Sequence, residues 1–541
     1  MRTKKEVTAD KLRGGFYTPA PLVDFVLRRL APGGLADGAR LLEPSVGDGA
    51  FLRGLSRLGQ SPLVTAVELS PDEATKARAE LRRSGLKGTV VTGSALSWEG
   101  SGGYDAATGN LPFVRFQFIS AADRTAAARA AAATGMSDSG VGNLWIPMLV
   151  VALTRLRVGG RFAFVLPAEC FTGVSAGRVR EWLLRHHNNL MLDLFPPGSF
   201  PDVLQEVVVL SGQRSAGPNA HTEIALIEHA EGHHEADEHD SKATVVRHRL
   251  EPSGASWTRL LLTGPQLEAY EFARGLAPVT LLADLAKLEV ATVTGANSFF
   301  SVNAETVAKH ALDPWLTPLL PRIRHATGLR FTTSDHKDLQ ASGSAAHLLT
   351  LTADTRVPAG SGLRRYLDVG EDAGLSERFK CRIRDPWYAV PGIKPSRLML
   401  TKRSHHYPRM VLNEAGVATT DTIYRGEAVS GVSAAALVAT FHNSLTLLSA
   451  ELEGRSFGGG VLELVPSEFK RLLVPNVPDM EHEIGRLDHL SREGVGTSDA
   501  EALVQETDRL LSKHAPDLTD DVMERLAQGR NNLLARRHAR T

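Results

Sequence analysis

From Arg40 to about Leu210, short apolar runs alternate with amphipathic stretches. The runs read ARLLEP, LVTAVELS, GTVVTGS, YDAATGN, GRFAFVLP and QEVVVLSG. Their length and β-branched content are typical of buried strands, and the stretches between them have helical spacing. This alternation indicates crossover connections. The first part of the chain is therefore predicted to be an α/β domain with a mostly parallel sheet.

The pattern changes beyond Trp257. Short β-like runs separated by Gly, Pro and charged residues continue to about Asn476 without a strand–helix rhythm, and a polar region with helical spacing of Leu and Val follows. We predict three parts: an α/β domain over residues 1–250, a mixed α/β domain over 251–478 and a helical tail over 479–541.

Two stretches depart from these patterns. Residues 121–140 are rich in alanine and then in Gly and Ser, which predicts a helix and a loop. The segment EHAEGHHEADEHDSK, residues 228–242, is too polar to bury itself and is expected to be a solvated loop. Metal binding by its histidines is the alternative, but we assign no metal; they are His229, His233, His234 and His239.

Composition narrows the classes of protein. The 541 residues are 43% hydrophobic, enough for more than one core, and 61 basic side chains balance 61 acidic ones. Any basic surface must therefore be local. The two cysteines, Cys170 and Cys381, lack metal or disulfide spacing, and no apolar stretch is long enough for a membrane span. A reducing cytoplasm is expected.

The segment LLEPSVGDGAFL places Gly47 and Gly49 between a strand and a helix. Glycines there allow a ligand close to the backbone. A second strand ends in Glu68, where nucleotide-binding folds place a carboxylate for ribose hydroxyls. The acids Glu43 and Asp48 would repel a pyrophosphate but suit a cationic sulfonium.

The tetrapeptide Asn110-Leu111-Pro112-Phe113 follows strand YDAATG, and here the chain resembles the γ-class, Taq-type DNA adenine methyltransferases with their NPP[FY] motif. The other motifs follow in the order of that family: FYTP, EPSVGDGAF, VELS, GNLWIPML, FVLPAEC and SFPDVLQEVVVL. In the second half, VATVTGANSFF, RDPWYAVP, TTDTIYRG and GRSFGGGVLELVPSEFKRLLVP are similar to its target-recognition domain.

The resemblance implies a Rossmann-like S-adenosylmethionine-dependent methyltransferase domain followed by a mixed α/β target-recognition domain. It implies double-stranded DNA as partner and transfer to the N6 amine of a flipped adenine, without a covalent enzyme intermediate. The cofactor-binding residues expected on this basis are Tyr17, Thr18, Pro19, Glu43, Ser45, Gly47, Asp48, Gly49, Glu68, Ser94 and Asn143.

The catalytic residues expected from the resemblance are Asn110, Leu111, Pro112, Phe113 and Phe200. An adenine amine is a poor nucleophile because its lone pair is delocalised, and acceptors for its two hydrogens favour a more tetrahedral nitrogen. The side-chain oxygen of Asn110 and the carbonyl of Leu111 are expected to be those acceptors. Phe113 and Phe200 are expected to stack on the flipped base.

Three residues depart from the family pattern. Leu111 replaces a proline, and Ser94 and Ala95 replace the acid and aromatic residue that bind the adenine of the cofactor. Loss of a charge-assisted contact, about 1.5–3 kcal/mol, weakens binding about ten-fold or more. A methyltransferase-like DNA-binding subunit of a defence complex is therefore an alternative, as is an amino-methyltransferase acting on RNA or protein.

Residues 322–409 contain 16 Lys and Arg against 8 Asp and Glu, so the second domain carries the local basic excess. Lys402, Arg403, Tyr407 and Arg409 are the predicted phosphate contacts. A solvated surface role is the alternative for each. Any restriction endonuclease or defence subunit is expected to be a separate chain.

Overall fold

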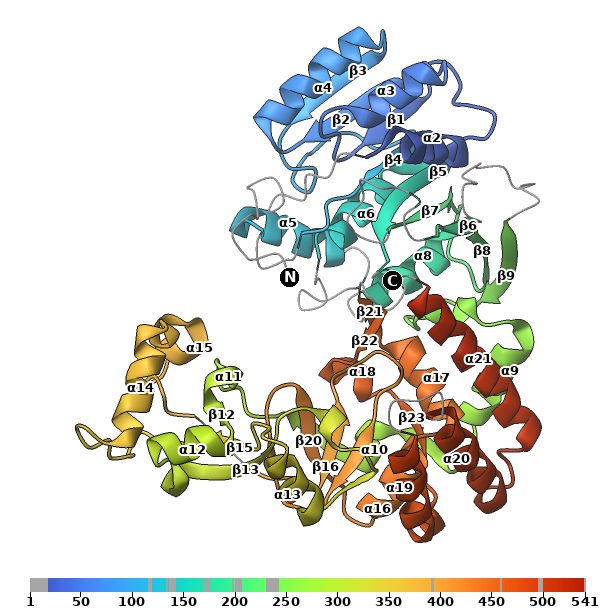
Figure 1. Ribbon diagram of the computed structural model, residues 1–541. Helices are drawn as coiled ribbons and strands as arrows, with labels where there is room; N and C mark the ends of the chain where they lie inside the picture. Colours follow the sequence, from blue (N-terminus) through green and yellow to red (C-terminus); the bar gives the residue numbers. More distant parts are fainter. Residues whose placement is uncertain are drawn as a thin grey trace. The chain divides into compact units, whose positions relative to one another are not determined.

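The computed structural model describes residues 18–114, 119–132, 135, 143–168, 170, 176–196, 199, 207–229, 243–390, 394–457, 460–494 and 500–539. The chain forms two compact units, Met1–Leu261 and Leu262–Ala539 (Figure 1). The helices predicted as a separate tail are part of the second unit.

The first unit alternates strands and helices as its sequence pattern predicts. Its elements are α2 (Ala20–Leu30), β1 (Arg40–Glu43), α3 (Ala50–Arg57), β2 (Leu63–Glu68), α4 (Pro71–Arg83), β3 (Lys87–Thr92), β4 (Tyr104–Asn110), α5 (Ala121–Ala132), α6 (Trp145–Thr154), β5 (Leu156–Pro167), α8 (Gly177–His186), β6 (His187–Leu194), β7 (Val207–Arg214), β8 (Thr222–Glu228) and β9 (Thr244–Leu250).

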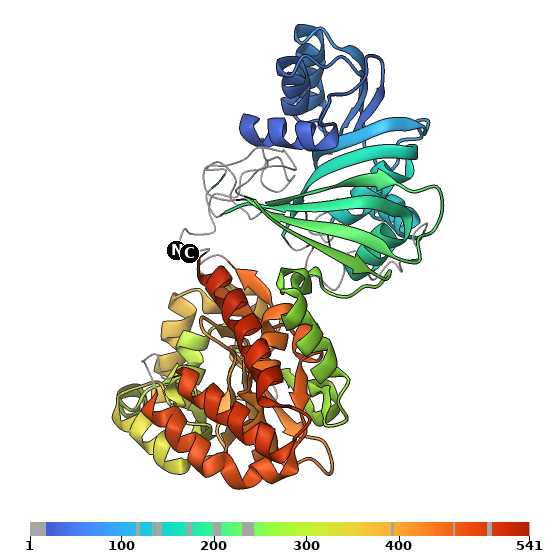
Figure 2. The same cartoon turned by 90° about the vertical axis from the view of Figure 1, so that its right-hand side faces the viewer.

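These strands form one sheet in the order β3-β2-β1-β4-β5-β7-β6-β8-β9. The strands from β3 to β5 are mutually parallel, and β7 runs antiparallel to both of its neighbours. The strand order reverses between β1 and β4, and ligands of open α/β sheets bind at such a switch point, beyond the carboxyl ends of the strands. The Rossmann-like fold prediction is confirmed. Figures 1 and 2 show this sheet from two sides.

Alternating side chains give the sheet two apolar faces. Leu41 and Ala106 pack with residues of α2, α3 and α4, whereas Leu42 and Ala107 pack with residues of α5, α6 and α8. Successive residues of a strand point to opposite faces, so apolar runs without polar alternation predict a sheet covered by helices on both sides. The first unit is accordingly a three-layer α/β/α structure.

The pattern analysis did not single out β6, β8 and β9. Strand β6 begins directly at the end of α8 with the polar residues His187–Asn189, so no turn signal precedes it. Beyond β8, His229 is buried and its Nε2 lies 2.9 Å from Asp193 Oδ1. For His229 the solvated-loop prediction is wrong; the other three histidines of that segment lie outside the described residues.

The second unit combines small sheets with helices. Its elements are α9 (Gly264–Arg274), β10 (Val279–Leu281), α10 (Leu282–Leu285), β11 (Ala286–Val290), α11 (Asn297–Phe300), β12 (Ser301–Val302), α12 (Ala304–His310), β13 (Leu316–Leu320), β14 (Arg330–Phe331), α13 (Thr333–Ala341), β15 (His347–Leu349), α14 (Gly362–Asp372), α15 (Phe379–Arg382), β16 (Leu398–Thr401), β17 (Arg403–Ser404), β18 (Met410–Asn413), β19 (Ala418–Thr419), β20 (Ile423–Ala428), α16 (Ala434–Phe441), α17 (Ser444–Glu453), β21 (Arg455–Phe457), β22 (Val461–Glu463), α18 (Pro466–Phe469), β23 (Leu473–Pro475), α19 (Ile484–Glu493), α20 (Ala500–His514) and α21 (Asp520–His538), with short 3-10 turns between some of them.

Two sheets form the middle of this unit. One has five strands in the order β11-β20-β16-β18-β14, and the other has four in the order β12-β15-β13-β19. Helix α21 packs against α17, α20 and α9, and α20 also contacts α16 and α17. Within the described part of the chain, no helix is long and apolar enough to cross a membrane.

Candidate active site

The predicted cofactor and catalytic motifs occupy two loops at one edge of the first sheet. The glycine segment follows β1, and the tetrapeptide begins at Asn110, the last residue of β4. Because β1 and β4 are parallel neighbours at the switch point, their carboxyl ends bring both loops together. The Ser45 hydroxyl donates to the backbone carbonyl of Asn110 over 3.0 Å, which joins the two motifs directly.

The glycine loop is held in shape by Glu68 at the end of β2. The carboxylate of Glu68 accepts from the backbone N–H of Gly47 at 2.9 Å and of Ser70 at 2.8 Å. A carboxylate has about four lone-pair sites, so these two bonds leave acceptor capacity for ribose hydroxyls. Gly49 has a φ of +89°, and a Cβ there would lie 3.0 Å from Glu80 Cβ, so the loop needs glycine at this position.

The side chain of Glu43 is buried at the centre of this site. It is 1% exposed, and neither carboxylate oxygen has a hydrogen-bond partner among the described residues. Burial raises the pKa of Glu43 well above its usual range, and the neighbouring carboxylates of Asp48 and Glu68 raise it further. A cation beside Glu43 would relieve both effects. The sulfonium and ammonium groups of S-adenosylmethionine fit this environment, and an anionic pyrophosphate does not.

Asp48 lies at the edge of the same loop and is paired with a cation of the protein itself. Its carboxylate is 2.6 Å from the Arg53 guanidinium, which also reaches Glu80 at 3.5 Å. The structure therefore gives Asp48 a part in shaping the loop, and its contact with the cofactor stays a prediction.

The amide nitrogen of Asn110 is hydrogen-bonded, whereas its amide oxygen has no partner among the described residues. Its Nδ2 donates to the hydroxyl of Thr18 over 3.1 Å, while its Oδ1 is buried with no hydrogen-bond partner among the described residues. The bond to Thr18 assigns the orientation of the amide and leaves the oxygen as a free acceptor. Thr18, predicted as a cofactor residue, is thus also a positioning residue for Asn110, which sequence reasoning missed. Pro19 follows as the N-cap of α2.

The rest of the tetrapeptide follows directly after β4. The Leu111 side chain is buried, its N–H donates to the Val165 carbonyl over 3.5 Å, and Phe113 is partly buried against the same apolar cluster. Pro112 is partly exposed. The replacement of proline by Leu111 is thus accommodated by core packing.

Four further residues belong to the motifs: Ser94, Ala95, Asn143 and Trp145. Ser94 is partly buried at the end of β3, and Ala95 is buried in the core. Asn143 accepts from the N–H of Trp145 over 3.5 Å, and Trp145 is 2% exposed in the core. Core packing therefore explains Trp145, and the cofactor roles of Ser94 and Asn143 stay predictions. Tyr17 and Phe200 lie outside the described residues.

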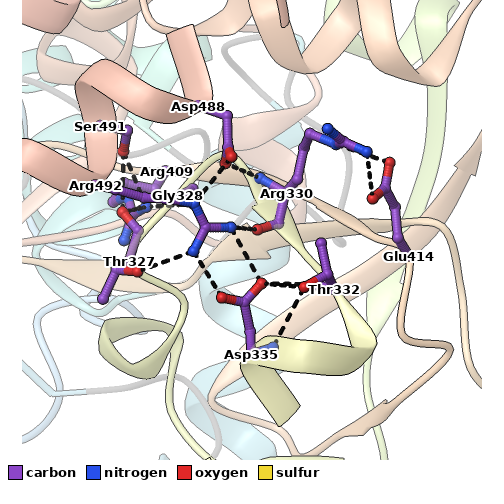
Figure 3. A network of polar contacts seen from close by, with 10 residues as sticks. All are labelled: Thr327, Gly328, Arg330, Thr332, Asp335, Arg409, Glu414, Asp488, Ser491 and Arg492. Atoms are coloured by element: carbon purple, nitrogen blue, oxygen red, sulfur yellow. Dashed lines mark hydrogen bonds and ion pairs between the residues drawn. The ribbon is translucent and has the colours of Figure 1, made fainter. Parts of the chain in front are cut away.

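In the second unit, the prediction of Arg409 as a phosphate contact is corrected. Its guanidinium donates to the carbonyls of Ala326, Thr327 and Gly328 at 2.6, 3.1 and 2.7 Å, and burial lowers its pKa. Arg409 therefore holds the loop before β14. Figure 3 shows it beside Arg492.

Arg492 continues the same network from α19. It pairs with Asp335 at 2.6 Å and Asp488 at 2.9 Å and donates to the Arg330 carbonyl, while Arg330 pairs with Glu414 (Figure 3). Asp335 and Asp488 hold the pKa of Arg492 far above its usual range. This network ties the region predicted as a tail to the β14–α13 segment.

The other predicted phosphate contacts differ in exposure and in the partners of their side chains; they are Lys402, Arg403 and Tyr407. Lys402 is partly exposed, whereas Arg403 is paired with Glu463 at 3.1 Å. Burial raises the pKa of Tyr407, whose ring meets His442 edge-on. The structure therefore does not present these residues as one open basic patch, and DNA contact by Lys402, Arg403 and Tyr407 stays a prediction.

Fold and site together define a Rossmann-like methyltransferase domain, with S-adenosylmethionine as the cofactor that its buried carboxylate and glycine loop suit, followed by a mixed α/β domain. Comparison with known proteins agrees with this class. Residues 254–511 match the family model described as Type II methyltransferase M.Eco57I, C-terminal domain.

Two relatives extend the similarity over most of the chain. The Type II methyltransferase M.XamI of Xanthomonas campestris pv. amaranthicola is 21% identical over 478 residues, 86% of this chain and 86% of that protein. The Type II methyltransferase M.AccI of Acinetobacter calcoaceticus is 20% identical over 471 residues, 84% of each chain. The solved type IIG restriction endonuclease BpuSI aligns with a TM-score of 0.42 and 14% identity over 98% of this chain and 67% of its own, a likeness too distant to bear on function.

Proposed function

We propose that this protein is a site-specific DNA methyltransferase that methylates the N6 amine of adenine, as the modification enzyme of a restriction-modification system. The observation that carries the proposal is the Asn110 amide, whose oxygen is buried, oriented by Thr18 and without a partner among the described residues, beside the loop that holds Glu43. The names of the relatives, all Type II methyltransferases, support the class of reaction.

When bound, S-adenosylmethionine supplies an electrophilic methyl group. The protein's part is to make the amine a better nucleophile and to exclude water. Asn110 Oδ1 accepts one hydrogen of the amine, and the carbonyl of Leu111 accepts the other, which favours a tetrahedral nitrogen with a localised lone pair. Because the amide of Asn110 is already held by Thr18, little reorganisation is needed when the base arrives.

The target adenine has to leave the duplex, because the exocyclic amine is inaccessible while the base is paired and stacked. Phe113, partly buried three residues beyond Asn110, is the proposed stacking partner on one face of the base. Phe200 is proposed for the other face. The mixed α/β domain is proposed to read the DNA sequence, in keeping with the family model that it matches.

The test is to incubate the purified protein with labelled S-adenosylmethionine and unmethylated genomic DNA and to digest the product to nucleosides. We expect label in N6-methyladenine for the unchanged protein and none for Asn110→Ala, with S-adenosylmethionine binding retained by the variant. Label in another nucleoside would overturn the adenine assignment. With RNA and protein offered in parallel reactions, label in RNA or protein alone, or DNA binding without any label, would overturn the proposal in favour of another amino-methyltransferase or a non-catalytic subunit.

A further inference from the structure

The second unit presents an unusual surface turn, Arg378–Arg384, with the sequence RFKCRIR. It contains the short helix α15 and exposes two large apolar side chains, Phe379 at 64% and Ile383 at 62%. Arg378, Lys380 and Arg382 are exposed among them. Apolar and cationic side chains therefore share one short projecting segment.

Two residues of the turn, Cys381 and Arg384, hold it against the rest of the unit. Cys381 is fully buried, and the Arg384 guanidinium donates to the carbonyls of Val293 and Thr294 at 2.5 and 2.8 Å. At Gly295, where φ is +83°, a Cβ would lie 2.9 Å from Lys380 Cβ and 3.0 Å from Cys381 Sγ. Glycine at position 295 thus lets the VTGANSFF segment pack directly against the turn, and this contact fixes the backbone of the turn.

The VTGANSFF segment is itself braced from two sides. The Asn297 amide donates to Asp421 over 2.8 Å, and Phe299 stacks on Tyr366 with ring centroids 4.5 Å apart. Motifs that are distant in sequence therefore meet to hold a single exposed turn in place. A rigid support of this kind lowers the entropy lost when the turn binds a partner.

The cations of the turn are available to a partner. In the part of the chain that the structure describes, the side chains of Arg378, Lys380 and Arg382 make no ion pair or hydrogen bond, although Lys380 Nζ lies 5.8 Å from the centroid of the Phe379 ring. Acidic residues bound the turn on either side at Glu377 and Asp385 but none lies within it. Cations outnumber acids in and beside the turn, and an exposed surface with unpaired cations complements a polyanion.

We propose that the Arg378–Arg384 turn is a DNA-contacting element, with Arg378, Lys380 and Arg382 on backbone phosphates and with Phe379 and Ile383 against bases in a groove. This inference rests on the proposed function. Apolar side chains flanked by cations are the means by which proteins contact or wedge apart base steps while neutralising the adjacent phosphates. The earlier sequence prediction of phosphate contacts at residues 402–409 did not single out this turn, although both lie in the same basic stretch.

The first test concerns charge. The full chain carrying Arg378→Gln, Lys380→Gln and Arg382→Gln is compared with a matched control carrying Arg28→Gln, Arg82→Gln and Lys87→Gln, which are exposed cations of α2, α4 and β3 in the first unit. Affinity for labelled duplexes cut from unmethylated genomic DNA is measured over a range of salt concentrations. We expect the slope of log affinity against log salt to fall in magnitude by about 2–3 for the turn variant and to stay unchanged for the control.

The second test concerns the apolar residues. Phe379→Ala with Ile383→Ala is compared with Phe272→Ala, which removes a phenylalanine that is 53% exposed on α9. We expect about five-fold or greater loss of duplex affinity at fixed salt for the turn variant, because its contacts with bases are lost, and no loss for the control. Thermal unfolding and S-adenosylmethionine binding should match those of the unchanged protein in every variant.

These results separate the two proposals. If the unchanged protein binds duplexes without transferring methyl groups, the proposed function fails while the variants still decide the role of the turn. If both turn variants bind DNA like their controls, with the same salt slope, the inference is overturned even where methyl transfer succeeds. A protein that binds no duplex at all overturns both.

Discussion

Replacement of Glu43 by glutamine should have opposite effects on the free protein and on its cofactor complex. Gln has nearly the shape of Glu but carries no charge. In the free protein, Glu43 is fully buried and its two oxygens have no partner among the described residues. An unsatisfied buried group costs about 1–3 kcal/mol, and more when it is charged, so removing the charge should stabilise the free protein by at least about 1 kcal/mol near neutral pH.

The pH dependence of stability shows why Glu43→Gln should stabilise the folded protein near neutral pH. The pKa of Glu43 is raised in the folded protein, so the folded state keeps the proton where the unfolded chain has lost it. The stability linked to Glu43 is therefore fully present below the unfolded pKa, about 4.3, and is lost as pH rises towards the folded pKa. Glu43→Gln should remove this dependence and raise the melting temperature by about 2–4 °C for each kcal/mol gained at neutral pH.

Glu43→Gln should weaken the binding of S-adenosylmethionine, although it should stabilise the free protein. If Glu43 faces a cationic group of S-adenosylmethionine, loss of one charge-assisted contact of about 1.5–3 kcal/mol should weaken binding by roughly ten- to a hundred-fold. Differential scanning calorimetry at several pH values and isothermal titration with S-adenosylmethionine measure both effects. A variant that is less stable at neutral pH, or that binds the cofactor as tightly as the unchanged protein, would refute the reasoning.

Three further predictions follow from other parts of the chain. Thr18→Val should lower kcat about five- to ten-fold at saturating S-adenosylmethionine, because about 1 kcal/mol of orientation of Asn110 is lost, and Thr18→Ser should restore it; unchanged kcat would show that the bond does not position the amide. Arg409→Met should lower the free energy of unfolding in urea by about 3 kcal/mol, since several carbonyls lose a charged donor, whereas Lys402→Gln should change it by less than about 0.5 kcal/mol; equal effects would contradict the framework role of Arg409. Burial raises the pKa of Asp508 to about 7, so the stability linked to this carboxyl should be lost as pH rises from about 4 to 7, with a slope of up to about 1.4 kcal/mol per pH unit, and Asp508→Asn should flatten the pH profile of urea unfolding.

The class of the first domain and the position of its site could be predicted from the sequence. Strand and helix periodicity is local, so the runs that end in Glu43, Glu68 and Asn110 reveal their strands without any knowledge of distant contacts. Parallel strands end at one edge of a sheet, so the loops after them can form one site, and the hydrogen bond from Ser45 to the Asn110 carbonyl shows that they meet.

Side-chain partners were not predictable in the same way. The hydrogen bonds between Thr18 and Asn110 and between Arg409 and Ala326 join residues far apart in sequence, and a local pattern carries no information about such pairings. Basic composition indicated where cations gather between residues 322 and 409. It could not distinguish Arg409, whose donors are used by carbonyl groups inside the fold, from Arg382, whose side chain remains at the surface.

The sequence by itself thus determined the strand–helix alternation between residues 40 and 210, the two loops of the candidate site and the location of the charge excess, because hydrophobic period and turn residues act over a few positions. Only the tertiary structure decided which polar atoms remain without partners and which are used to hold the fold. That difference arises because hydrogen bonding is settled by long-range packing, and it separates the oxygen of Asn110 and the Arg378–Arg384 turn from residues of the same types elsewhere in the chain.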